Sequence, residues 1–271
     1  MAALTLYCPF FRRAFGWSVP IGGLGGLIGL GGGEFRLPVL MYALGFDAKA
    51  AIPVNLMVSL ITLAFSMLVR SRALSPDAIL PFLPEVFGLA AGGVVSAFYG
   101  AQLVQGLTSK RLVQTVGVLL AGIGVLMLIE VVAPVQYAAP LPTSPAIHVA
   151  IGFAIGIGIG LVSSMLGVAG GELLIPTLMF IFGADIKTAG SASILISLGV
   201  VLTGIWRYWR LDAIPEGRGI KRITFAMASG SVVGATLGGL AVAYAPVGVL
   251  KVVLGCVLIV AAAKTIRHQR Q

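Results

Sequence analysis

Two stretches of the chain decide its fold, because they repeat one another. Residues 29–59 read GLGGGEFRLPVLMYALGFDAKAAIPVNLMVS, and residues 167–197 read GVAGGELLIPTLMFIFGADIKTAGSASILIS. They align without a gap at an offset of 138 residues. Low-complexity apolar sequence matches Leu with Leu by chance, but it does not align Gly-Gly-Glu, Pro, Gly, Asp and Lys at one offset. The chain therefore contains a duplication, whose identical pairs include Gly32/Gly170, Gly33/Gly171, Glu34/Glu172, Pro38/Pro176, Gly45/Gly183, Asp47/Asp185, Lys49/Lys187 and Ser59/Ser197.

The composition places this duplication in a membrane. Of the 271 residues, 58% are apolar and only 10% are charged, and the mean hydropathy is +1.06. Soluble domains are about 45–50% apolar and about 25% charged, and they cannot hide a larger excess of apolar surface from water. A soluble enzyme, a nucleic-acid-binding protein and a disordered protein are excluded. The net charge of +9 is typical of membrane proteins with basic cytoplasmic loops.

Charge-poor windows of sequence predict the membrane segments. A helix needs about 20 apolar residues to cross the hydrocarbon core. Two of the ten windows are too short to cross, and each of these follows a longer window after a glycine cluster. We count each such pair as one broken segment, which gives an all-α polytopic protein of about eight segments. The windows are Ala14–Gly33, Leu37–Phe46, Ala50–Val69, Ala78–Ser109, Leu112–Ile129, Ile147–Gly171, Leu173–Ala184, Thr188–Trp206, Ile223–Ala245 and Val247–Ala263.

A proline-rich stretch separates the two halves. Residues 134–145 read PVQYAAPLPTSP, with four prolines and no charge, which is typical of a linker. We therefore expect a first four-segment repeat over residues 1–133, a linker over 134–146 and a second repeat over 147–271. The first segment of each repeat is broken at its glycine motif.

The relative orientation of the repeats has two readings. With four crossings in each half the repeats are parallel, and with five crossings, each broken segment forming a hairpin, they are inverted. The excess of Lys and Arg in cytoplasmic loops hardly separates the two schemes. The uncharged linker favours inversion, whereas the shortness of Leu37–Phe46 argues against a second crossing. Both schemes place the Arg207–Arg222 loop and the C-terminus in the cytoplasm of a multi-pass cell-membrane protein.

The glycine motifs are the candidate functional site. Gly31, Gly32, Gly33 and Glu34, with Pro38, correspond to Gly170, Gly171, Glu172 and Pro176. Consecutive glycines destabilise a helix by about 1 kcal/mol each relative to alanine. A break followed by a new helix exposes N–H groups and the positive end of a dipole, which suits an anion. The alternative is that these glycines only permit close helix packing.

Ionisable residues inside membrane segments are candidates for function. Glu34 and Glu172 cap the half-helices in one reading, which we prefer, and carry a coupled proton in the other. Arg36 has no counterpart, since residue 174 is Leu. It pairs with Glu34 or grips an anion if it lies at depth, and it reaches out to the surface if it does not. We further expect ion pairs between Asp47 and Lys49 and between Asp185 and Lys187, a lone carboxyl at Glu85, and an ammonium at Lys251 that extends to the membrane surface.

Four polar residues lie one helical turn apart on the helices that follow the motifs. Asn55 and Ser59 have Ser193 and Ser197 as their counterparts. They place hydrogen-bonding groups on one helix face, where they serve either an oxyanion or interhelical bonds.

The segments GLGGGEFRLPVL and GVAGGELLIPTL, the LG-x-D and FG-A-D turns and the Ala/Asn/Ser helices after them resemble the TauE/SafE sulfite exporter family. The resemblance covers essentially the whole chain. It implies a multi-span inner-membrane carrier of sulfite, sulfoacetate or other organosulfonates, coupled to the proton gradient. It also implies that the motif glycines and prolines named above are those of the family. Ala169, in place of a glycine, and Arg36 depart from the motif.

We therefore predict a secondary transporter for a small anion, with its substrate site at the two breaks. Its partners are that anion, the lipid bilayer and a coupling proton or cation. A passive anion channel is the first rival, and a membrane scaffold has no need of costly glycine breaks. An intramembrane enzyme requires a nucleophile and base, a metal set or a redox dithiol. We find none of these and predict no cofactor, because the two cysteines and the two histidines are far apart in sequence.

Overall fold

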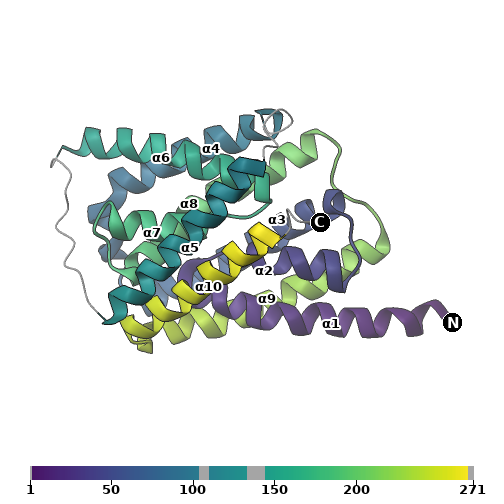
Figure 1. Cartoon of the computed structure of the whole chain (residues 1–271). Coiled ribbons are helices and arrows are strands. Elements are labelled where there is room, and N and C mark those ends of the chain that lie inside the picture. The colour runs from purple at the N-terminus through teal and green to yellow at the C-terminus, as the bar shows by residue number, and fades with distance from the viewer. Residues whose placement is uncertain (1, 104–109, 133–143, 268–271) are drawn as a thin grey trace.

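The computed structural model describes residues 2–103, 110–132 and 144–267, and these residues form helices without a strand (Figure 1). Most of the proline-rich linker lies outside the described residues, so the division into two repeats remains a prediction. The helices of the first half are α1 (Ala2–Leu24), η1 (Gly25–Gly29), α2 (Gly33–Pro38), η2 (Val39–Ala43), α3 (Ala48–Ala73), η3 (Pro76–Phe82), α4 (Leu83–Leu103) and α5 (Lys110–Val132). Those of the second half are α6 (Pro145–Leu166), α7 (Gly171–Phe180), α8 (Ile186–Arg210), α9 (Arg218–Tyr244) and α10 (Val247–Arg267).

The lengths of the helices identify a multi-pass membrane protein, as predicted. Five stretches of the described chain are long and apolar enough to cross a membrane, and three apolar helices are shorter. This confirms an all-helical membrane fold but does not establish eight spans. The long stretches are Lys49–Ala73, Asp77–Tyr99, Pro145–Ser164, Ile186–Arg210 and Arg218–Tyr244, and the shorter ones are Leu120–Val132, Gly171–Phe180 and Val247–Ala263.

The backbone follows the same path twice. In the described chain, left-handed glycines occur in three pairs that are each 138 residues apart. Only glycine adopts this conformation without strain, so the duplicated sequence imposes the same turns in both halves. The pairs, with their φ angles, are Gly29 (100°) and Gly167 (66°), Gly32 (70°) and Gly170 (80°), and Gly45 (72°) and Gly183 (76°).

Helices of the first half pack against helices of the second half. The most extensive packing joins α4 to α6 and α1 to α9, and the 138-residue offset converts one pair into the other. A Cβ on Gly22 would lie 2.6 Å from the Ser231 carbonyl oxygen, and a Cβ on the equivalent Gly160 would lie 2.7 Å from the Gly93 oxygen. Glycines in α1, α4, α6 and α9 thus allow close backbone contact between these helices.

Equivalent helices of the two halves run in opposite directions. The end of α3, at Arg70, bonds to the start of α8, at Lys187, whereas Leu56 of α3 contacts Gly204 near the end of α8. In α5 and α10, Glu130 pairs with Lys251 and Gly124 approaches Gly255. Figure 1 shows α5 and α10 crossing the molecule side by side. The halves therefore have opposite orientations in this structure.

The chain turns back at each break. The short helix after the break therefore returns to the side of the molecule where the helix before the break began. Leu40 and Leu44, in and after η2, belong to one buried cluster with Ala14 of α1 and with Ala51 and Val54 at the start of α3. The α1–α2 segment is thus a hairpin, and the same path in the second half makes α6–α7 a hairpin that enters from the opposite side. We call the side where α3 ends the Arg70 side, and the side where α8 ends the Arg207 side.

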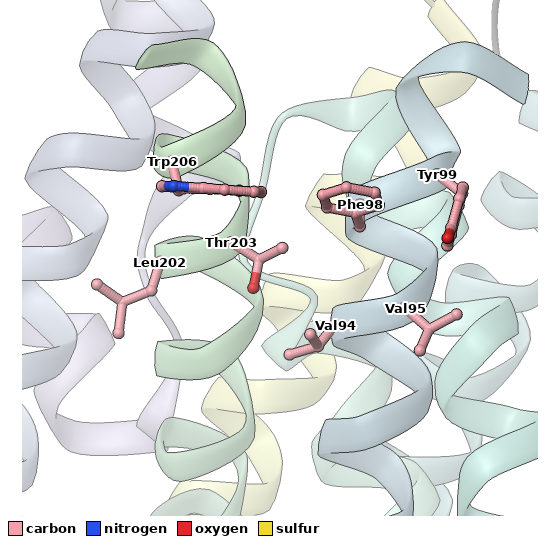
Figure 2. A pocket seen from close by; sticks show the side chains of 7 residues that line it. All are labelled: Val94, Val95, Phe98, Tyr99, Leu202, Thr203 and Trp206. Atoms are coloured by element: carbon pink, nitrogen blue, oxygen red, sulfur yellow. The ribbon is translucent and has the colours of Figure 1, made fainter. Parts of the chain in front are cut away.

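Apolar surface covers the outside of the bundle. An open groove of about 490 Å³ lies between α4 and α8. Figure 2 shows the side chains that line it, which are Val94, Val95, Phe98, Tyr99, Leu202, Thr203 and Trp206. The rings of Phe98 and Trp206 stack with their centroids 5.6 Å apart, and the Arg210 guanidinium lies 4.9 Å from the Trp206 ring. An exposed aromatic and aliphatic surface of this kind suits contact with lipid.

The close approach of α4 and α6 predicts a position-specific loss of stability. A methyl group at Gly160 would lie 2.8 Å from the Gly93 Cα, whereas Gly158, half a turn away, has open space around it. We expect Gly160→Ala to lower the free energy of unfolding by about 1–3 kcal/mol through overpacking, and Gly158→Ala to leave it unchanged or raise it by up to about 1 kcal/mol, because alanine favours a helix more than glycine does. Thermal unfolding in detergent, followed by circular dichroism, measures both variants. Equal melting temperatures would contradict the close packing.

Candidate functional site

Each glycine motif ends one helix and starts another inside the bundle. In the first half the chain leaves η1 at Leu30, which is extended (ψ 152°), and α2 begins after the left-handed Gly32. In the second half Gly167 ends α6, and α7 begins after the left-handed Gly170. The first N–H groups of a helix and the last carbonyl groups have no partner within the helix. Each break therefore concentrates polar backbone in an apolar setting.

The two breaks meet one another. A Cβ on Gly31 would lie 2.9 Å from the Cβ of Ala169, its equivalent in the other half. A Cβ on Gly171 would lie 3.1 Å from Leu30 Cδ2, and one on Gly33 would lie 3.5 Å from Val168 Cα. The departure of Ala169 from the motif has a structural consequence, because its methyl group fills the space that Gly31 leaves open. The breaks thus form one centre built from both halves.

Side chains from α3 and α8 satisfy the backbone of the breaks. Asn55 donates to the carbonyl oxygens of Gly167 (2.9 Å) and Gly33 (3.3 Å). Its counterpart Ser193 donates to the oxygen of Gly29 (3.3 Å), which is the equivalent of Gly167. Each half therefore fastens the break of the other half. In this structure the two side chains make interhelical bonds, and their other suggested role, binding an oxyanion, stays a prediction.

The serines one turn further along hold their own breaks. The Ser197 hydroxyl donates to the oxygen of Ala169 (3.1 Å). Its counterpart Ser59 accepts a hydrogen bond of 2.9 Å from Arg36 Nη1. Both hydroxyls are fully buried, so the four polar residues predicted from the sequence lie together around the two breaks.

Arg36 lies at the centre and is completely buried. The guanidinium donates to five neutral oxygens: Asn55 Oδ1 (3.3 Å), Ser59 Oγ (2.9 Å), the Gly31 carbonyl (3.3 Å), Thr62 Oγ1 (3.1 Å) and Ser231 Oγ (3.2 Å). The reading in which this side chain extends to the membrane surface is therefore wrong. Its counterpart Leu174 is buried too, so the centre is asymmetric and carries one fixed cation.

Glu34 and Glu172 occupy the second position of α2 and α7, and both are at least nine-tenths buried. The N-cap positions belong to Gly32 and Gly170 instead, without a side-chain cap bond. Within the described residues, both carboxyl oxygens of Glu34 and one of Glu172 have no hydrogen-bond partner. The expected N-cap role of the two glutamates is therefore wrong, although the dipole of each helix still favours a negative charge there.

Other charged residues have partners that the sequence did not reveal. Asp47 and Asp185 are the N-caps of α3 and α8, accepting from backbone N–H groups at 3.2 and 2.9 Å, and the Lys187 ammonium donates to the Ala243 oxygen (3.2 Å). These caps replace the ion pairs that we expected. Glu85 is not a lone carboxyl, since it bonds to His148, and Lys251 does not extend to the surface, since it pairs with Glu130.

Thr62 and Ser231 bond to Arg36, and Arg70 makes a separate set of bonds to Gly26, Leu27, Lys187 and Ser191. The sequence analysis missed all three residues. Asn55, Ser59, Thr62, Ser66 and Arg70 recur every three or four residues, which places them on one face of α3. That polar stripe was visible in the sequence. Ser231 gave no comparable signal, because only the folded chain brings α9 beside Arg36.

Comparison with protein families gives a match over nearly the whole chain. The family model described as "Sulfite exporter TauE/SafE" matches residues 14–265, a range that contains both breaks and all the residues of the centre. Neither the curated proteins nor the solved structures contain a match to this chain.

The network around Arg36 predicts a large loss of stability when the guanidinium is removed. Arg36→Met leaves buried acceptors on α3, on α9 and at Gly31 without their donor, and we expect a cost of about 3 kcal/mol or more. Arg72→Met is the matched control, because it removes an exposed arginine from the end of α3, the helix that carries three of the acceptors of Arg36. Chemical unfolding in detergent measures both. If the two variants have the same free energy of unfolding, the bonds of Arg36 do not stabilise the fold.

Proposed function

Because the chain belongs to the sulfite exporter TauE/SafE family, we propose that it is a secondary transporter that moves a small sulfur oxyanion, such as sulfite or an organosulfonate, by alternating access. One observation carries the proposal: two broken helices from opposite halves meet at Gly31 and Ala169, beside a buried guanidinium. Secondary transporters with inverted repeats bind substrate at such breaks, near the middle of the membrane. The substrate site comprises the residues of the two motifs together with Asn55, Ser59, Ser193 and Ser197.

The charge of the centre supports an anionic substrate. Arg36 bonds only to neutral oxygens, so none of its bonded partners cancels its charge. A buried charge without a counter-ion is costly, and an oxyanion that displaces one of these neutral acceptors gains a charge-assisted bond. The start of α7, a ten-residue helix, adds the positive end of a dipole from the other half.

The two carboxyl groups support coupling to protons. Glu34 and Glu172 are buried beside the same centre. When both are ionised, the centre holds one net negative charge and repels an anion. When both are protonated, it holds one net positive charge and attracts one. Binding of an oxyanion together with protons therefore keeps a low-dielectric site near neutrality, and this charge balance is the basis of our coupling proposal.

The distribution of Lys and Arg supports a cell-membrane protein with its C-terminus in the cytoplasm. With the halves inverted, α1 begins and α10 ends on the Arg207 side. The side with more Lys and Arg in its short loops faces the cytoplasm. By our assignment the Arg207 side has Arg12, Arg13, Lys49, Lys110, Arg111, Arg207, Arg210, Arg218, Lys221, Arg222, Lys264 and Arg267, and the Arg70 side has Arg70, Arg72, Lys187 and Lys251.

Flux in proteoliposomes tests the function. Vesicles loaded in turn with sulfite, sulfoacetate, sulfate and lactate are assayed with and without a pH gradient, and protein-free vesicles serve as blanks. We expect saturable flux of a sulfur anion that responds to the gradient. A membrane potential near 100 mV alone shifts one charge by about 2.3 kcal/mol, so the potential is clamped. Flux that neither saturates nor responds to the gradient would indicate a passive channel. If no anion moves, the proposal that the substrate is a small sulfur oxyanion is wrong.

The breaks predict two variants that insert but do not transport. A side chain at Gly32 would face a left-handed backbone (φ 70°) and the Ile21 side chain, and one at Gly171 would face Leu30 of the opposite break. Since displacing a substrate-positioning group by about 1 Å costs about 100-fold in rate, we expect Gly32→Leu and Gly171→Leu to abolish flux. Gly122→Leu, which enters open space, is the control. Normal flux in both test variants would remove the breaks from the mechanism.

The carboxyl groups predict a loss of coupling. Glutamine keeps the size of glutamate but cannot exchange a proton, so Glu34→Gln and Glu172→Gln hold the centre in its protonated charge state. We expect the double variant to exchange sulfur anions across the membrane while the pH gradient no longer drives their accumulation. Counterflow measures the exchange of anions, and gradient-driven uptake in the same vesicles measures their accumulation. Unchanged gradient-driven uptake would assign these glutamates a structural role.

A further inference from the structure

Besides Arg36 and Leu174, the two halves differ at residues 70 and 208, which are equivalent by the 138-residue offset. Residue 208 is a half-buried tyrosine and residue 70 is a buried arginine. Each lies near the end of the helix that follows a break, on opposite sides of the molecule. The difference therefore concerns the two routes that lead from the centre to the two faces of the membrane.

A small cavity lies beside the second break on the Arg207 side. It has a volume of about 40 Å³, and its lining includes Arg207 and Tyr208 together with Ser163, Gly167 and Val168 of the second break. The Ser163 hydroxyl is buried and has no hydrogen-bond partner within the described residues. A Cβ on Gly170 would meet that hydroxyl, so the group lies at the start of α7. The cavity thus joins a cationic rim to an unused donor beside the centre.

Arg70 fills the equivalent space on the other side. Its guanidinium donates to the carbonyl oxygens of Gly26 and Leu27 (3.0 Å each), to the Lys187 oxygen (2.8 Å) and to Ser191 Oγ (3.1 Å). It is 1% exposed. One side chain on α3 therefore ties the end of η1 to the start of α8 and covers the first break from the Arg70 side.

The sequence explains why the two routes differ. Ile52 inserts its side chain against the second break, where a Cβ on Gly167 would lie 3.0 Å from it. The equivalent of Ile52 is Gly190, and without a side chain there the backbone of the first break packs against α8, so that a Cβ on Gly29 would lie 2.6 Å from the Gly190 Cα. The Ile52 side chain keeps α3 apart from the second break on the Arg207 side, whereas Gly190 lets α8 pack closely on the first break on the Arg70 side.

Resting on the alternating-access function proposed above, we propose that Arg70 is the gate that closes the route between the centre and the Arg70 side, and that an oxyanion opens it. Its present acceptors are three backbone carbonyls and one hydroxyl. A charge-assisted bond to an oxyanion is about twice as strong as a neutral one. A small oxyanion at the first break therefore competes with Gly26 and Leu27 for the same N–H groups and releases the helices that these bonds hold together.

Thiol labelling tests the gate without any substrate. In a chain with Cys8→Ser and Cys256→Ser, the reporter is Ser66→Cys, one turn before Arg70. The Ser66 hydroxyl has no partner in the described structure, so the reporter removes no bond. In sealed vesicles of known orientation, a membrane-impermeant thiol reagent should not label this position from either side. Removing bonds of a charged donor shifts a closed state by about tenfold or more, so Arg70→Ala should raise labelling from the Arg70 side by that factor.

Arg72→Ala is the matched control, since it removes an exposed arginine from the same helix end, and it should leave the reporter protected. The inference is overturned if Ser66→Cys is labelled equally with and without Arg70, or if Arg72→Ala exposes it as strongly. It is also overturned if a monodisperse Arg70→Ala protein stays protected, because Arg70 would then be only a structural clamp.

A reciprocal variant tests the inference if Arg70→Ala does not fold. The reporter Gly204→Cys lies in the cavity, where its Cβ would be 3.4 Å from Leu56 Cδ1, and it should label from the Arg207 side. Tyr208→Arg places the guanidinium at the equivalent position and should protect this reporter, whereas Tyr208→Phe should not. Labelling that is unchanged by Tyr208→Arg overturns the inference. The labelling experiments contain no anion, so their outcome does not depend on the substrate. Absence of flux therefore contradicts only the proposed function, and unchanged labelling contradicts only the gate.

Discussion

Everything in this molecule depends on keeping broken backbone hydrogen-bonded inside an apolar bundle. A helix that stops at mid-depth leaves N–H and C=O groups without partners, and lipid offers none. The chain supplies them from the helices that follow the breaks. Asn55 and Ser193 bond across to the opposite break, and Arg70 bonds to the last carbonyls of η1. The breaks persist because the polar stripes of α3 and α8 satisfy them.

That requirement also couples the two halves. Each break is fastened by the other half, and the closest backbone contacts pair α1 with α9 and α4 with α6. A shift of one hairpin therefore disturbs bonds in both halves at once. Packed elements with two discrete arrangements are what alternating access requires. In the mechanism proposed here, the differences between Ile52 and Gly190 and between Tyr208 and Arg70 keep one route more open than the other.

Particular residues show how far sequence reasoning reached. The pairing of Gly32 with Gly170 predicted that each segment breaks at its glycine motif, because a left-handed turn needs glycine wherever the chain goes. The surroundings of Arg36 could not be predicted in the same way. One of its acceptors, Ser231, is 195 residues away, and whether arginine extends to water or is buried depends on which helix lies beside it. The same holds for Glu85 and Glu130, whose partners His148 and Lys251 lie on other helices.

The sequence by itself determined a helical membrane protein, an internal duplication and two helix breaks, because hydropathy, periodicity and glycine conformation are local properties of the chain. Its motifs also indicated the family to which it belongs. The tertiary structure alone decided that equivalent helices run in opposite directions, that the breaks meet at Gly31 and Ala169, and that Arg70 covers one of them. The direction of each helix and its contacts depend on how many times the chain crosses the membrane before reaching it. The distribution of Lys and Arg could not distinguish four crossings in each half from five.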